Sequence, residues 1–108
     1  MQTLKKNECS ILYLTLKKEW YKLIWNGIKR EEYRDATDYW KVRIGNFVER
    51  GAAKNLKLVV AFSLWRRKAD LFMMMTGCKI FESSYHIEWG EPSGRHYAIS
   101  LGERVNVV

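Results

Sequence analysis

Three charged residues, Lys29, Glu32 and Arg34, lie close together in a stretch that reads KREEYR. An amine, a carboxylate and a guanidinium can together hold a phosphate, accept a hydrogen bond from a base, or transfer a proton. Side chains alternate along a strand, so Arg30, Glu32 and Arg34 would share one face. That spacing predicts a polar binding cleft. The alternative is a solvated ion pair, worth ~0–1 kcal/mol.

The elements that must position these residues can be read from the spacing of apolar residues. Residues 11–16 (ILYLTL) predict a buried strand. A helix follows, which is expected to end at Gly27 because glycine tolerates the left-handed conformation. Its apolar face would carry Trp20, Leu23, Ile24 and Ile28. Residues 30–34 then predict the strand that bears the charges.

A second helix is predicted over residues 40–51, with Thr37 or Asp38 as its N-terminal cap. Residues 56–64 predict a core strand, because every even position in that stretch is apolar.

Two further strands are predicted over residues 79–89 and 95–101, and the methionine-rich residues 71–75 are expected to form a helical turn packed on the core. The order of elements indicates a single α+β domain over residues 1–108, with residues 1–9 as a polar lead-in. We expect the later strands to curl into a small barrel.

Composition favours a polyanionic partner. The chain has 19 Lys and Arg against 12 Asp and Glu, for a net charge of +7, and it contains five Trp and six Tyr. Bases stack on aromatic rings while cations hold phosphates, so this mixture indicates nucleic acid.

The sequence argues against a metal or cofactor site, against secretion and against a membrane span. Cys9 and Cys78 lack CxxC spacing, and His86 and His96 have no third ligand at a suitable spacing, so we expect neither a metal nor a cofactor. No signal peptide and no apolar run of membrane-spanning length is evident. We therefore expect a soluble, cytoplasmic protein that has no membrane partner.

Residues 11–43 resemble the ASCH domains, small relatives of the PUA-like RNA-binding barrels. The family pattern has a helix that ends in glycine, a basic residue two positions later, and an arginine in the next strand, here Gly27, Lys29 and Arg34. The closing segments WGEP and YAISLG are also similar to the end of that barrel. The resemblance covers nearly the whole domain and implies a PUA-like barrel flanked by two or three helices. It also implies recognition of RNA or a modified nucleoside or nucleotide.

One branch of the family hydrolyses acetylcytidine with a lysine, a threonine and a glutamate. Lys29 matches the lysine, but Glu32 occupies the position of the threonine. A threonine hydroxyl can act as nucleophile or orient a water, whereas a carboxylate can serve as base or charge partner. The hydrolase alternative would use Lys29 and Glu32 with Glu82 or Glu88 as a further carboxylate. Glu82 and Glu88 share one face of a predicted strand, which faces either solvent or the cleft.

The substitution favours binding over catalysis. The residues expected to contact nucleic acid combine cations, one carboxylate and one indole: Lys17, Lys29, Glu32, Arg34, Arg43, Trp65, Arg66 and Arg67. For Trp65 the alternative is a ring tucked into the end of the barrel. A third possibility for the whole domain is an interaction module without a ligand cleft, in which Glu32 and Arg34 pair only with each other.

Overall fold

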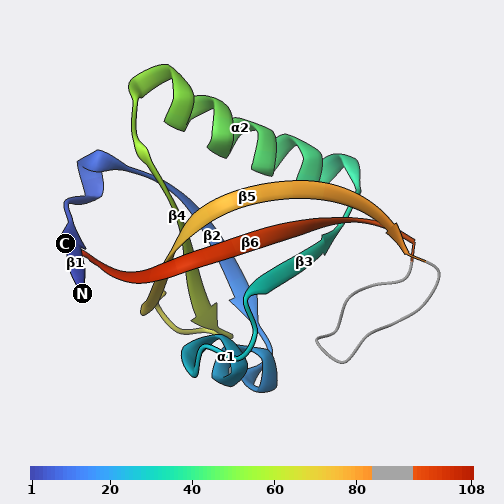
Figure 1. The fold of residues 1–108 in the computed structure, drawn as a ribbon, viewed down its shortest axis with the longest axis horizontal. Helices are drawn as coiled ribbons and strands as arrows, with labels where there is room; N and C mark the ends of the chain where they lie inside the picture. Colours follow the sequence, from blue (N-terminus) through green and yellow to red (C-terminus); the bar gives the residue numbers. More distant parts are fainter. Residues whose placement is uncertain (84–93) are drawn as a thin grey trace.

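The computed structural model describes residues 1–83 and 94–108, and for residues 81–83 it describes the backbone alone. It contains a mixed six-stranded sheet and two α-helices (Figure 1). In chain order the elements are β1 (Gln2–Leu4), a 3-10 helix (Lys6–Glu8), β2 (Cys9–Leu16), α1 (Lys18–Trp25), β3 (Glu31–Asp35), α2 (Asp38–Lys54), β4 (Lys57–Leu64), β5 (Leu71–Ser83) and β6 (Gly94–Val107).

The strands form one sheet in the order β1-β6-β5-β4-β2, and β3 also pairs with β6. β2 runs parallel to β4, and β1 runs parallel to β6, whereas the other pairs are antiparallel. In the described part of the chain, β2 pairs only with β4 and β3 only with β6, so the sheet is not closed. The predicted α+β class is therefore confirmed, in the form of an open mixed sheet.

Both helices pack into the same core. In Figure 1, α2 lies above the strands and α1 lies below them. Ile24 of α1 and Ile44 and Phe47 of α2 belong to one cluster of buried side chains, together with even-numbered residues of β2 and β4. Because side chains alternate along strands, the odd-numbered Cys9 and Val59 point to the opposite face, where they form a second cluster with Leu4 and Val105.

The sequence predictions for β4 and for the methionine-rich segment of β5 differ from the structure, because side chains are buried on both faces of the sheet there. In β4 the odd-numbered Val59 and Ala61 are as buried as Val60 and Phe62, so the middle of the strand is buried on both faces. The methionine-rich segment is not a helical turn, because residues 71–75 lie in β5, where Met73 is opposite Val60.

Two other expectations differ from the structure near the N-terminus. The expected polar lead-in contains β1, whose Leu4 is buried. The first helix ends at Trp25, so Ile28 is not on its apolar face and is 55 % exposed. Of the predicted strand 79–89, residues up to Ser83 belong to β5, and residues 84–89 lie outside the described residues.

Packing of α2 on the core gives the first prediction. Ile44 is buried and Val42, two residues earlier, is 59 % exposed, although both are β-branched and lie in the same helix. We expect Ile44→Ala to lower the free energy of unfolding by ~2–5 kcal/mol, since it leaves a cavity. Val42→Ala should change it by no more than ~0.5 kcal/mol, because only helix propensity is altered. Urea unfolding measures both, and similar losses in the two variants would contradict this packing.

Candidate functional site

The turn between α1 and β3 places Lys29. Gly27 adopts a φ of 75°, which a residue with a side chain rarely takes up, and this ends the helix as predicted. The amides of Ile28 and Lys29 both donate to the Leu23 carbonyl, at 2.9 and 3.1 Å, and so close the end of the helix. The chain then enters β3, where Glu32 lies opposite Ile99 of β6. The glycine stop and the β3–β6 pairing together bring Lys29 and Glu32 to the same place.

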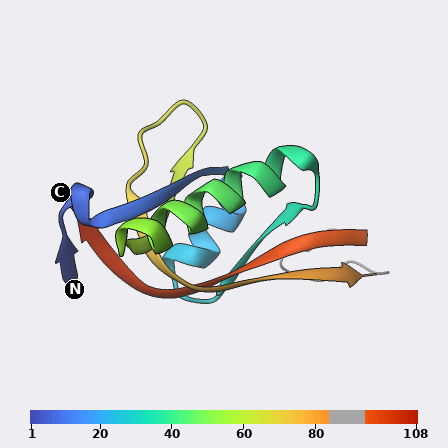
Figure 2. The ribbon, with the colours of Figure 1, turned by 90° about the horizontal axis from the view of Figure 1, so that it is seen from above.

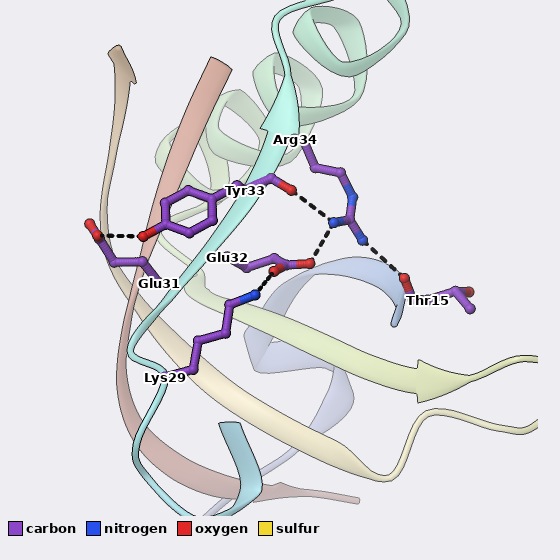
Figure 3. A network of polar contacts seen from close by, with 6 residues as sticks. All are labelled: Thr15, Lys29, Glu31, Glu32, Tyr33 and Arg34. Atoms are coloured by element: carbon purple, nitrogen blue, oxygen red, sulfur yellow. Dashed lines mark hydrogen bonds and ion pairs between the residues drawn. The ribbon is translucent and has the colours of Figure 1, made fainter. Parts of the chain in front are cut away.

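Glu32 lies between two cations (Figure 3). Lys29 Nζ donates to Glu32 Oε1 at 2.8 Å, and Arg34 Nη1 donates to Glu32 Oε2 at 2.5 Å. Arg34 also donates to the backbone carbonyls of Tyr33 at 2.9 Å and Thr15 at 3.0 Å. The three charged residues singled out from the sequence thus form one ion cluster, which we call the Lys29–Glu32–Arg34 cluster.

Aromatic rings surround the cations of this cluster. Lys29 Nζ lies 4.7 Å from the centroid of the Trp20 ring and 5.5 Å from that of Tyr33. The Arg34 guanidinium carbon lies 5.1 Å from the centroid of Trp40. Ring faces attract cations, and this attraction strengthens when water is excluded. The rings therefore help to offset the cost of removing these charges from water.

The cluster is buried, so it differs from the open cleft that we expected. Lys29 and Glu32 are 2 % and 3 % exposed, and the Arg34 side chain is 17 % exposed. Both carboxylate oxygens of Glu32 already accept a hydrogen bond from a cation. A general base must come within hydrogen-bond reach of the proton that it removes. A substrate could reach Glu32 only if Lys29 or Arg34 moved away.

Two arginines bind the free edge of β2. Arg34 donates to the Thr15 carbonyl, and Arg43 of α2 donates to the Tyr13 carbonyl, each from Nη2 at 3.0 Å. Tyr13 and Thr15 are two residues apart, so their carbonyls point the same way, away from β4. The guanidinium groups satisfy backbone acceptors on that edge, and Arg34 links the outer strands β2 and β3.

A second group of cations lies where β2 and β4 end. The two strands are parallel, and Leu16 lies opposite Leu64, so the residues that follow them are neighbours. In Figure 2 the connection from β4 to β5 projects away from the rest of the fold. We call this exposed group the strand-end rim; its residues are Lys17, Lys18, Trp65, Arg66 and Arg67.

The indole of the strand-end rim is open to solvent. Trp65 is 75 % exposed, so the alternative of a ring tucked into the end of the sheet is wrong. Arg66 adopts a left-handed φ of 61°, which is uncommon for a residue other than glycine. Its guanidinium carbon lies 6.0 Å from the Trp65 ring centroid. An exposed indole and nearby cations are the components of a single-strand nucleic-acid surface.

The connection between β4 and β5 carries most of the strand-end rim. A hydrogen bond holds this connection against α1. The Tyr21 hydroxyl donates to the Asp70 carboxylate at 2.6 Å, and the Asp70 amide donates to the Phe62 carbonyl at 3.2 Å. Burial, together with the Asp70 carboxylate, raises the pKa of Tyr21 to about 12. The protonated phenol is the form that this contact favours.

The remaining candidates from the sequence are Arg43, Glu82 and Glu88. Arg43 is near the cluster, because its guanidinium carbon is 4.9 Å from the Trp40 ring centroid, on which Arg34 also lies. Glu82 belongs to β5. Glu88 lies outside the described residues.

Sequence reasoning missed several residues near these groups. Trp20 and Tyr33 flank Lys29, and Asn46 and Arg50 lie beside Arg43. For Asn46 and Arg50 a signal existed, since they follow Arg43 at the i+3 and i+7 positions of a helix.

The described part of the chain also bears on metal sites, reactive thiols and membrane spans. There, no group of three or more His, Cys, Asp or Glu side chains is placed to hold a metal ion. Burial raises the pKa of both the Cys9 and the Cys78 thiols, so neither is prepared as a nucleophile. Among the same residues, no helix has the length and apolar character that crossing a membrane requires.

Comparisons of the chain with protein-family models, with curated proteins and with solved structures gave no match.

The cluster predicts an unequal effect of removing its members. Glu32→Gln leaves two cations without their carboxylate, so we expect it to lower the free energy of unfolding by ~3–5 kcal/mol. Lys29→Met should cost less, because Glu32 keeps Arg34. Urea unfolding provides the measurement, with Glu31→Gln as the control on the other face of β3. An equal or larger loss in Lys29→Met would show that the carboxylate is not the centre of the cluster.

The Tyr21–Asp70 contact predicts a pH effect of definite sign. The folded pKa lies above the ordinary value of 10.0, so the contact stabilises the fold below pH ~10, and this contribution is lost as pH rises through about 12. NMR titration of the Tyr21 ring carbons should give a midpoint near that value. Asp70→Asn should lower the midpoint, whereas Asp38→Asn, in a different element, should not. A midpoint that is unchanged in Asp70→Asn would contradict the contact.

Proposed function

We propose that this chain is an ASCH-type, PUA-like domain that recognises RNA or a modified nucleoside or nucleotide. The observation that carries the proposal is the strand-end rim, where the exposed Trp65 and the cations that follow the parallel strands β2 and β4 lie at the same end of the sheet. The net charge of +7 agrees with an anionic ligand. In this proposal the open sheet, with α1 and α2 packed into one core, takes the place of the expected PUA-like barrel, and Arg34 links its outer strands β2 and β3.

The strand-end rim suits a single strand better than a duplex. Stacking on an exposed ring requires an unpaired base, and each stacked base contributes ~1–3 kcal/mol to binding. Lys17, Arg66 and Arg67 lie at neighbouring strand ends, where they can contact successive phosphates. Phosphate contacts of this kind weaken steeply as salt rises, since they depend on the release of counterions.

The Lys29–Glu32–Arg34 cluster supports this surface from inside. Arg34 bonds to the carbonyl of Thr15, which is two residues before Lys17. The carboxylate of Glu32 holds Arg34 in the orientation that makes this bond. The partly exposed Arg34 is then the member of the cluster best placed to meet a ligand, and Lys29 and Glu32 fix its position.

Two alternatives are less well supported. The acetylcytidine hydrolase would need Glu32 or a further carboxylate as base, yet both Glu32 oxygens are engaged by cations. An interaction module was expected to pair Glu32 and Arg34 only with each other. Instead Lys29 shares Glu32, and Arg34 also bonds to β2.

Binding of a fluorescent single-stranded RNA, followed by anisotropy, tests the proposal. Trp65→Ala should weaken binding by about 5- to 150-fold, because it removes a stacking ring, whereas Trp65→Phe should retain most of the affinity. Arg66→Gln should reduce the slope of log K against log salt by about 0.7, the value for one phosphate contact on a single strand. Lys79→Gln is the matched control, since it removes the same charge from an exposed position on β5.

Three results would count against the proposal: no binding of any RNA, binding that is independent of salt, or equal effects of Arg66→Gln and Lys79→Gln. The hydrolase alternative is checked in the same preparation by measuring acetate release from acetylcytidine. Acetate release by the wild type would favour the hydrolase over simple binding, and turnover that is unchanged in Lys29→Ala would eliminate a mechanism that uses this lysine.

A further inference from the structure

A hollow of about 230 Å³ lies between α2 and β2, on residues that the strand-end rim does not include. We call it the α2–β2 hollow; its lining residues are Ile11, Leu12, Arg43, Asn46, Phe47 and Arg50. Pockets that enclose drug-sized ligands have ~300–1,000 Å³, so this hollow suits a smaller chemical group.

Helical spacing brings the polar residues of the hollow onto one side of α2. Arg43, Asn46 and Arg50 stand at positions i, i+3 and i+7, which lie above one another on a helix. Phe47, at i+4, is buried beneath them. The result is an apolar floor with two guanidinium groups and an amide above it, and none of the lining residues is acidic.

The structure holds both arginines in place while leaving donors available. Arg43 donates from Nη1 to the Tyr39 hydroxyl at 3.2 Å and from Nη2 to the Tyr13 carbonyl at 3.0 Å. Arg50 donates from Nε to Ser10 Oγ at 3.1 Å. A guanidinium has five N–H donors, so each arginine is oriented by part of its set and can offer the rest to a ligand.

The contact between Arg50 and Ser10 is itself anchored in the core. Ser10 is completely buried, and its hydroxyl donates to the Phe47 carbonyl at 2.8 Å. Since the Ser10 hydrogen is used in this bond, its oxygen is the acceptor that faces Arg50. Arg50 is an exposed residue on α2, and this bond ties it to β2. Such preorganisation reduces the entropy lost when a ligand binds.

We propose that the α2–β2 hollow binds a phosphate group. Guanidinium forks match the oxygens of phosphate in bidentate geometry, and the Asn46 amide adds a neutral donor between them. A phosphate monoester carries close to two negative charges, which corresponds to the two arginines. The source can be free phosphate, a small phosphate ester, or a phosphodiester of a bound strand. Only the last of these rests on the function proposed above.

Titration of the ¹⁵N-labelled chain with inorganic phosphate, at constant ionic strength, tests the hollow. Amide shifts of Ile11, Leu12 and the α2 residues around Asn46 should saturate. Arg50→Gln should weaken phosphate binding by about tenfold or more, because it removes a charge-assisted donor. Lys41→Gln removes the same charge from another face of the helix and should change the affinity less than about twofold.

A second arm uses a single-stranded RNA and assigns the source of the phosphate. RNA that shifts the same amides, and that inorganic phosphate displaces from them, supports a phosphodiester as the ligand. RNA that shifts only the strand-end rim, with phosphate still bound in the hollow, supports a free phosphate or small ester. If RNA fails to bind anywhere while phosphate binds, the proposed function fails and the hollow stands.

The proposal on the hollow is overturned if phosphate causes no saturable shift in the wild type. It is equally overturned if Arg50→Gln, shown to be folded by its amide spectrum, binds phosphate as well as Lys41→Gln does. Arg50→Lys provides a further check, since it keeps the charge but loses the planar fork, and its affinity should fall between those of the wild type and Arg50→Gln.

Discussion

The carboxylate of Glu32, buried between Lys29 and Arg34, is the interaction on which the arrangement of this fold depends. Lys29 comes from the turn after α1, and Arg34 reaches across to β2, so a single side chain fixes three segments relative to one another. A buried ion cluster adds little net stability, but losing one member is costly because charges are then left uncompensated. The cluster therefore favours one arrangement of β3 over others more than it adds to the total free energy of folding.

The charged residues of this domain form a buried set, which holds the fold together, and an exposed set, which is available to a ligand. The buried charges are paired with one another and with backbone carbonyls, which leaves them little freedom to enter a reaction. Among the described residues, the exposed cations Arg66 and Arg50 have no acidic partner, and the donors of Arg50 other than Nε remain available to a ligand. Binding through the exposed set does not require the buried set to move, and this is the physical reason for preferring recognition over catalysis.

The sequence predicted the parts of this arrangement that depend on side-chain type and period. The glycine stop at Gly27 and the meeting of Glu32 with Arg34 followed from local rules, and so did a cap at Thr37 or Asp38, of which the structure uses Thr37. The partners of Arg34 and Arg43 on β2 could not be predicted, because backbone carbonyls are present at every residue and leave no trace in the sequence. The methionine-rich part of β5 was missed because burial on both sheet faces removes the alternation that identifies a strand.

β2 adjoins both proposed binding regions, the strand-end rim and the α2–β2 hollow. The state of its edge explains why these regions use side chains for binding and not backbone pairing. A free strand edge is normally open to pairing with another extended chain. Here Arg34 and Arg43 occupy the carbonyls of Thr15 and Tyr13, so an added strand would have to displace two charged donors. The same arginines place positive charge along that edge, between the hollow beside Ile11 and the rim that begins after Leu16. Protection of the edge and attraction of an anionic ligand are therefore two consequences of the same contacts.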